Sequence, residues 1–346
     1  MNANRLLGEG KSFYHVCSRT TNREFYFRSS KDKEVCKKIM RNLETFLSCR
    51  VITYCLMSNH FHILLEVPDR ETLEPLTEER LLELLPLLYD DTYVLTVKQM
   101  FDRARELKDE KSREAEFARI LNQYEKRRAS LSAFVGEFKQ RVSKYINKEH
   151  DRRGTLWESR FTSVLVEGNE GTLLTMAAYI DLNPVRAGMV KRPEDYRWCG
   201  YAEAAAGNLE SRRALGAMLS ESFIDEDYRA DWRRTHKRYR LFIYSEGLER
   251  EANPETGEKA RKGFSEKEVE QVEKADGAMP IRAILRHKVR YFCDGAVLGT
   301  AEFVNEVFER ERDRFGPNRE TGARKMQGAD WGDLRVLRNL QKDVVG

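Results

Sequence analysis

The chain has 346 residues, of which 34% are charged and 40% hydrophobic, and its formal net charge is +4. This length allows two domains, and the absence of any run near the ~18 apolar residues of a membrane span argues against a membrane protein, so we expect a cytoplasmic one. The six cysteines lack zinc or disulfide spacing, so the sequence suggests neither a zinc module nor a disulfide framework.

The first 70 residues alternate between strand and helix patterns. Residues 12–19 read as a strand, and residues 31–47 as a helix with its apolar residues on one stripe. Two further strands are predicted at residues 49–55 and 61–67, joined near residues 57–59. The order strand, helix, strand, strand indicates an α+β protein.

Two histidines, His60 and His62, lie one residue apart where the last of these strands begins. Side chains alternate between the faces of a strand, so both imidazoles share one face and Phe61 takes the other. Neutral imidazole is the commonest metal ligand, although such a pair is also compatible with a polar surface. Glu66 shares their face, either as an extra ligand or in a salt bridge at the end of the strand.

Residues 71–130 are rich in Glu, Leu, Lys and Arg with helical periodicity, as at residues 78–89 and 97–108. We interpret this stretch as an inserted helical lobe whose charged faces are solvated. The next helix is predicted at residues 131–147.

A basic stripe follows one side of that helix and continues into the chain beyond it. It either contacts phosphate groups or is an ordinary solvated face. Trp157 could stack on a nucleic acid base, or it could be a core residue. The candidate DNA-contacting residues are Lys139, Arg141, Lys144, Arg152, Arg153, Trp157, Arg160 and Arg186.

A second polar constellation lies on a helix predicted at about residues 170–182, with Asn169 as its N-cap and Pro184 ending it. Tyr179 and Asn183 are one turn apart on the same side, which leaves a phenol and an amide oxygen together. Taken singly, Tyr179 could be a packing residue and Asn183 a turn former.

These motifs carry a family resemblance. His60-Phe-His62 resembles the His-hydrophobe-His motif of the HUH nucleases, and residues 178–188 are similar to the tyrosine helix of their single-tyrosine transposases. The most specific signature is Met57-Ser-Asn-His-Phe-His62. Residues 14–19 and 154–161 resemble other family segments, as does Asp195-Tyr-Arg-Trp198 with Tyr201. The closest resemblance is to the REP-associated, IS200-like branch, over roughly residues 5–70 and 130–205.

The resemblance implies the fold of residues 1–210. We expect an antiparallel sheet of the split βαβ type, ferredoxin-like or RRM-like, with a further strand at residues 163–166 and helices packed on one face. The histidine strand is expected centrally, with the tyrosine helix lying across it.

The resemblance also implies an activity. The expected enzyme is a metal-dependent, single-stranded DNA endonuclease and strand transferase that cleaves next to a hairpin through a 5′-phosphotyrosine and can rejoin strands. Tyr179 would be the nucleophile, and His60, His62 and Asn183 would hold Mg²⁺ or Mn²⁺, with no nucleotide cofactor. The expected partner is single-stranded or hairpin DNA, bound by a nucleoid-associated monomer or homodimer.

Beyond the catalytic domain, residues 211–262 are predicted to be a helical extension and linker. Residues 263–346 are expected to form a small, mostly helical module, with helices at 265–274, 280–290 and 300–315. A helix-turn-helix is one interpretation of this module, and an ordinary helical bundle is another.

Two other functions fit the same motifs. The protein could be a domesticated DNA- or RNA-hairpin-binding protein that no longer cuts. It could also be a replication initiator or relaxase, although those relatives often carry paired tyrosines, and Tyr179 has no partner at i+3 or i+4.

Overall fold

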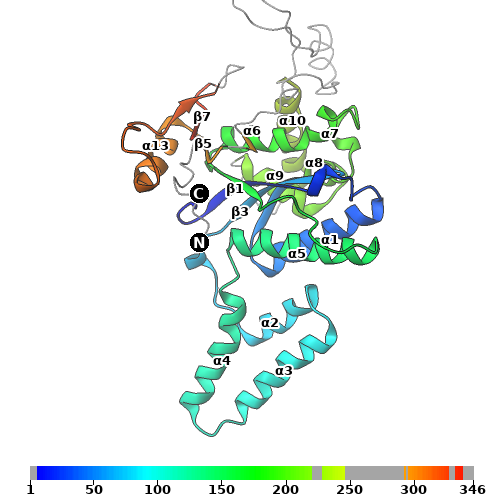
Figure 1. Cartoon of the computed structure of the whole chain (residues 1–346), viewed down its shortest axis with the longest axis vertical. Coiled ribbons are helices and arrows are strands. Elements are labelled where there is room, and N and C mark those ends of the chain that lie inside the picture. Colours follow the sequence, from blue (N-terminus) through cyan, green and yellow to red (C-terminus); the bar gives the residue numbers. More distant parts are fainter. Residues whose placement is uncertain (1–5, 220–227, 246–291, 294, 327–331, 338–346) are drawn as a thin grey trace, which may run out of the picture.

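The computed structural model describes residues 6–219, 228–245, 292–293, 295–326 and 332–337, and the statements below refer to these residues. They form an α+β fold around a seven-stranded sheet with the order β2-β3-β1-β4-β5-β7-β6 (Figure 1). The strands are β1 Ser12–Arg19, β2 Arg50–Leu56, β3 His60–Val67, β4 Thr162–Val166, β5 Val297–Gly299, β6 Arg324–Lys325 and β7 Arg335–Leu337.

The strand register explains how the histidine face is built. β3 lies between β2 and β1 and pairs antiparallel with both, so that His62 is opposite Cys55 on one side and Cys17 on the other. His60 is opposite Arg19, and His15 is opposite Leu64. Because directly paired residues point to the same face of a sheet, His15, His60 and His62 share one face.

Helices cover both faces of the sheet, which corrects the expectation of helices on one face. α1 Ser30–Phe46 and α5 Leu131–Glu149 pack against the face of Phe61, Ile63 and Leu65. The opposite face is covered by α6 Glu170–Asp181, α8 Gly200–Ala205, α9 Leu209–Met218 and α10 Tyr228–Ser245 (Figure 1). Both faces of β3 are buried over most of their length, which requires a covering layer on each side.

The tyrosine helix α6 matches the local signals in the sequence. The Asn169 side chain accepts the backbone N–H of Thr172 at 2.8 Å, which confirms the predicted N-cap. The helix ends at Asp181, two residues before the short α7 Asn183–Arg186, which contains Pro184. Tyr179 and Asn183 therefore lie on either side of a break between two helices.

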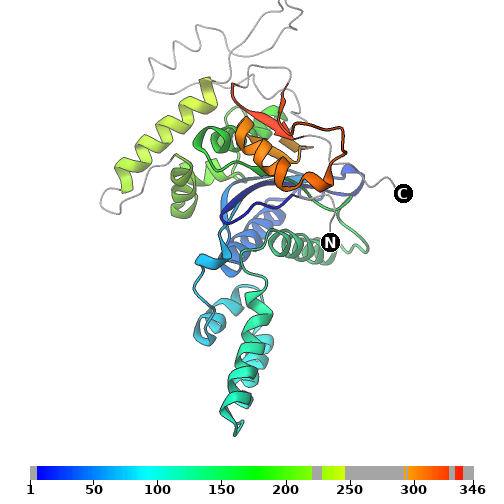
Figure 2. The ribbon, with the colours of Figure 1, turned by 90° about the vertical axis from the view of Figure 1, so that its left-hand side faces the viewer.

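The predicted insertion consists of α2 Glu78–Leu84, α3 Asp91–Arg105 and α4 Glu110–Glu125. These helices project away from the sheet as a narrow lobe (Figures 1 and 2). Arg141 of α5 joins the lobe to the body, because its guanidinium donates to the Leu88 carbonyl at 2.7 Å and lies over the Tyr89 ring.

The described part of residues 263–346 differs from the helical module that we expected. It contains one α-helix, α13 Ala301–Arg310, and the strands β5, β7 and β6. β5 pairs in parallel with β4, so this segment continues the central sheet (Figure 2). α13 falls within the helix predicted at residues 300–315, and the Thr300 N–H before it donates at 2.6 Å to Glu167 Oε2, more than 130 residues away in the sequence. The helices predicted at 265–274 and 280–290 lie outside the described residues.

Candidate active site

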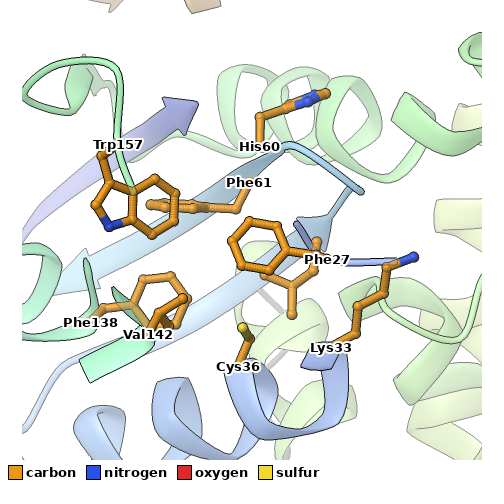
Figure 3. A pocket seen from close by; sticks show the side chains of 9 residues that line it. Phe27, Lys33, Cys36, His60, Phe61, Phe138, Val142 and Trp157 are labelled. Carbon is orange, nitrogen blue, oxygen red and sulfur yellow. The ribbon is translucent and has the colours of Figure 1, made fainter. Parts of the chain in front are cut away.

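The side chains of β3 alternate between the two faces of the sheet as predicted, so the imidazoles of His60 and His62 lie on the face opposite the Phe61 ring. Phe61 packs against Phe138 and Trp157 on one face, whereas the His60 ring is directed away from that cluster (Figure 3). The His60 and His62 rings are nearly perpendicular, with centroids 5.1 Å apart. His62 is 2% exposed and His60 is half-buried.

Hydrogen bonds fix how the His60 ring presents its nitrogens. The Asn59 Nδ2 amide donates to the Arg23 carbonyl at 2.9 Å, which turns the Asn59 Oδ1 oxygen toward His60 Nδ1 at 2.7 Å. An amide oxygen only accepts, so Nδ1 of His60 carries the hydrogen, and whenever the ring is neutral its Nε2 carries a lone pair. An imidazole binds a metal through the lone pair of its unprotonated nitrogen.

The other histidine, His62, belongs to a buried pair with His15 of β1. Its Nδ1 lies 2.8 Å from His15 Nε2, and the two rings stack. Burial lowers the pKa of His15 to about 4, and burial together with the neighbouring His15 and His60 lowers the pKa of His62 well below its usual range. Both rings are therefore neutral at pH 7.

The structure brings Tyr179 of α6 onto this histidine pair. The Tyr179 ring meets the rings of His62 and His15 edge-on, at centroid distances of 5.9 and 5.8 Å. Its opposite neighbours are Phe292, with centroids 4.9 Å apart, and Cys293, whose Sγ lies 3.1 Å from the phenol oxygen. Tyr179 is 1% exposed, and burial raises its pKa.

Asn183 and Arg186 complete the surroundings of the phenol. The Arg186 guanidinium lies 4.5 Å above the Tyr179 ring and donates to the Asn183 Oδ1 oxygen. Asn183 is 5% exposed. Within the described structure, Asn183 Nδ2 and Arg186 Nη1 are buried donors without an acceptor. Unsatisfied buried donors are costly, so this corner suits an incoming anion.

The nitrogen and oxygen atoms of the predicted metal ligands are of the types that bind divalent cations. No group of three or more His, Cys, Asp and Glu with metal-binding potential occurs in the described residues. The predicted set instead combines two imidazoles with the Asn183 amide oxygen, which keeps a second lone pair beside its bond to Arg186. Glu66 is engaged elsewhere, because its carboxylate faces Arg50 at 3.5 Å.

Comparison with known proteins identifies the segment that holds the histidines. Residues 10–78 match the family model described as transposase IS200 like. This segment is similar to that of the IS200-like transposases. It contains β1, α1, β2 and β3, and thus His15, His60 and His62, whereas Tyr179 and Asn183 lie outside the matched residues.

Other comparisons add little. No curated protein matches the chain. One solved structure, of a REP-associated tyrosine transposase bound to a REP hairpin, aligns over 58% of this chain and 82% of its own, with 12% identity and a TM-score of 0.32. A score this low does not establish a shared overall fold. Among the described residues, the helices are too short or too polar to cross a membrane.

Some of the predicted DNA-contacting residues lie near His60, at the start of β3. The loop after α5 runs along the end of β1, where Glu158 N–H donates to the Arg19 carbonyl at 3.0 Å and Arg19 is paired with His60. Arg153 and Arg160 of this loop are exposed. Arg152 lies 3.9 Å over the Tyr26 ring. The loop therefore presents basic residues at the edge of the site.

Other predicted contacts have structural partners. Trp157 is 8% exposed and donates its indole N–H to the Lys139 carbonyl at 3.0 Å, so its ring has little surface to offer a base. The Lys139 ammonium lies over that indole and donates to Ser159. Arg141 faces the inserted lobe, and Lys144 is exposed on α5. The residues of the predicted basic stripe therefore do not form one continuous exposed surface.

Sequence reasoning missed four residues around the histidines of the matched segment. His15 and Arg19 share the face of His60 and His62, and a period of two within β1 is the signal that could have found them. Phe292 and Cys293 carry no local signal, because only the tertiary fold brings them to Tyr179.

Proposed function

We propose that the protein is a metal-dependent single-stranded DNA endonuclease and strand transferase. It would cleave beside a hairpin and hold the cut strand as a 5′-phosphotyrosine on Tyr179. The observation that carries the proposal is the contact of the Tyr179 ring with His62 on one side and Arg186 on another. The IS200-like segment supports the same activity.

The chemical step needs a nucleophile, a place for the phosphate and a leaving group. The Tyr179 oxygen would form a bond to phosphorus as the bond from phosphorus to the 3′ oxygen breaks, and the phenol proton is passed on so that the product carries a 3′-hydroxyl. The reverse step rejoins the strand, which explains why no nucleotide cofactor is needed.

The buried donors beside Tyr179 would receive the phosphate. Arg186 Nη1 and Asn183 Nδ2 both lack an acceptor in the described structure, and a non-bridging phosphate oxygen would supply one. The Arg186 charge also favours the phenolate form, since it opposes the rise in the pKa of Tyr179 that burial causes.

His60, His62 and Asn183 would hold the cation. His60 presents a lone pair at Nε2, and two imidazoles with one amide oxygen leave positions open for water and phosphate. Mg²⁺ or Mn²⁺ bound there would neutralise charge on the scissile phosphate. The imidazole nitrogens favour Mn²⁺ of the two.

Replacement of Tyr179 by phenylalanine tests the nucleophile. Tyr179→Phe removes one oxygen and should abolish the covalent adduct with a labelled single-stranded hairpin in Mn²⁺, while DNA binding stays within a few-fold. The adduct is measured on denaturing gels, with EDTA as the metal-free control. Tyr93→Phe makes the same change on the inserted lobe and should leave the adduct unchanged. An adduct that survives in Tyr179→Phe assigns the nucleophile elsewhere.

A second function is favoured by the burial of the phenol. The Tyr179 hydroxyl is covered by Phe292 and engaged with Cys293, an arrangement that also suits a hairpin-binding protein that does not cut. Retained hairpin binding with no adduct in Mn²⁺, in the wild type and in variants that uncover Tyr179, would favour this second function.

A further inference from the structure

The His62 ring belongs to a buried hydrogen-bond chain that ends on a backbone carbonyl. His62 Nδ1 lies 2.8 Å from His15 Nε2, and His15 Nδ1 lies 2.7 Å from the Phe292 carbonyl oxygen. His15 is 1% exposed. The chain thus joins β3, β1 and the C-terminal segment inside the protein.

The carbonyl at the end of this hydrogen-bond chain determines which nitrogen donates in each hydrogen bond. A carbonyl oxygen only accepts, so Nδ1 of His15 carries a hydrogen. His15 is neutral because it is buried without a carboxylate partner in the hydrogen bonds of its ring, so its Nε2 holds a lone pair. Nδ1 of His62 must then donate to that lone pair. The remaining nitrogen of His62, Nε2, is left unprotonated.

The Nδ1 atom of His60 also donates a hydrogen bond, but to a different partner. Its Nδ1 donates to Asn59 Oδ1, whose amide is oriented by the Arg23 carbonyl. Two unrelated hydrogen-bond chains therefore leave the Nε2 lone pair on both histidines. A surface pair of histidines would have no need of such an arrangement, because water satisfies either tautomer.

We propose that His15 is a positioning residue that holds His62 as the Nδ1–H tautomer and so presents its Nε2 lone pair to the cation. The part concerning the cation rests on the proposed function, whereas the tautomer of His62 is a property of the metal-free protein. Hydrogen-bonded partners of this kind orient metal-binding histidines and raise their basicity. His15 touches neither DNA nor the phenol oxygen in this role.

Nitrogen NMR of the metal-free protein tests the tautomer directly. Long-range ¹H–¹⁵N correlation of the ¹⁵N-labelled full chain should show His62 with a protonated Nδ1 and an unprotonated Nε2, assigned by the signals that His62→Gln removes. The outcome that overturns the proposal is an Nε2–H tautomer or a positively charged His62 ring at pH 7. This measurement needs no DNA, no metal and no folded His15 variant.

Two substitutions of His15 test its role. In His15→Gln, the amide can donate to Phe292 and accept from His62, so the tautomer should be kept and Mn²⁺ affinity should stay within a few-fold. His15→Phe fills the space without the relay, so His62 should shift toward the Nε2–H form. Mn²⁺ affinity, measured by calorimetry, should then fall roughly 10- to 100-fold.

The outcomes separate this inference from the proposed function. A folded His15→Phe protein that retains the His62 tautomer and wild-type Mn²⁺ affinity overturns the role of His15. Wild-type protein that shows the expected tautomer but no Mn²⁺ binding supports the relay and contradicts the metal-dependent function. Equal losses in His15→Gln and His15→Phe would mean that the hydrogen bonds of the side chain at position 15 do not account for the Mn²⁺ affinity, which also overturns the relay.

Discussion

At the scale of single residues, Asp181 is a buried carboxyl group at the end of the helix that carries Tyr179. It is fully buried and accepts from the Thr53 hydroxyl at 2.7 Å and the Tyr239 hydroxyl at 2.5 Å. Burial raises its pKa from 3.8 to about 7, although these hydrogen bonds oppose the rise. Asp181 thus joins α6 to β2 and α10.

This raised pKa predicts a pH dependence of stability. The folded protein favours the protonated carboxyl, so the stabilisation is full below about pH 4 and is lost as the pH rises through about 7. At about 1.4 kcal/mol for each pH unit, the loss is at most about 4 kcal/mol. Asp181→Asn should remove this dependence, and urea unfolding from pH 5 to 8 measures it. A constant difference between variant and wild type would contradict the prediction.

Arg186 is the residue whose loss should most affect the chemistry while leaving the phenol in place. Its guanidinium touches the Tyr179 ring and the Asn183 oxygen, and charged hydrogen bonds contribute about 1.5 to 3 kcal/mol. Arg186→Ala should slow adduct formation roughly 10- to 100-fold, with a smaller effect in Arg186→Lys.

The control for this prediction is an exposed arginine on the same side of the sheet. Arg213→Ala removes an arginine paired with Glu210 on α9, away from the phenol, and should leave the rate unchanged. The time course of adduct formation is the measurement. Equal rates in wild type and Arg186→Ala would remove Arg186 from the site.

At the scale of elements, the start of α6 determines how firmly Tyr179 is held. The Asn169 side chain satisfies the Thr172 N–H, and loss of such a cap costs about 1 kcal/mol. Asn169→Ala should therefore lower the urea midpoint, whereas Asn169→Asp should keep it, because aspartate caps equally well. Similar midpoints for Asn169→Ala and wild type would show that packing alone fixes the helix.

Elements built from local signals were predictable from the sequence. The period of two around His60 and His62, and the cap and proline flanking Tyr179, each lie within one element and predict its bounds and faces. The features that could not be predicted depend on contacts with segments that are distant in the sequence. Residues 297–299 pair with β4 only in the folded protein, and whether Trp157 is buried or exposed depends on α5 packing beneath it.

At the scale of the whole molecule, the C-terminal segment lies over the site. Phe292 packs on Tyr179, and Cys293 contacts its hydroxyl, so under the proposed function an incoming phosphate would have to displace them. The double variant Phe292→Ala, Cys293→Ala keeps the Phe292 carbonyl for His15 and should increase adduct formation several-fold.

The matched control for this variant lies in the same C-terminal segment. Phe315→Ala removes a buried ring that packs on Phe308 of α13, and it should leave the adduct rate unchanged. Spectroscopic titration of the phenol gives a second readout, since an uncovered Tyr179 should ionise at a lower pH. A slower rate in the double variant would mean that the two residues support the site.

The position of Phe292 in the chain has a consequence for synthesis. The ribosome completes β1, β3 and α6, and thus His15, His62 and Tyr179, more than a hundred residues before Phe292 and Cys293. At about 5 to 20 residues per second, roughly 6 to 23 seconds of synthesis separate Tyr179 from Phe292. During that interval Tyr179 lacks the cover that Phe292 and Cys293 give it in the finished protein.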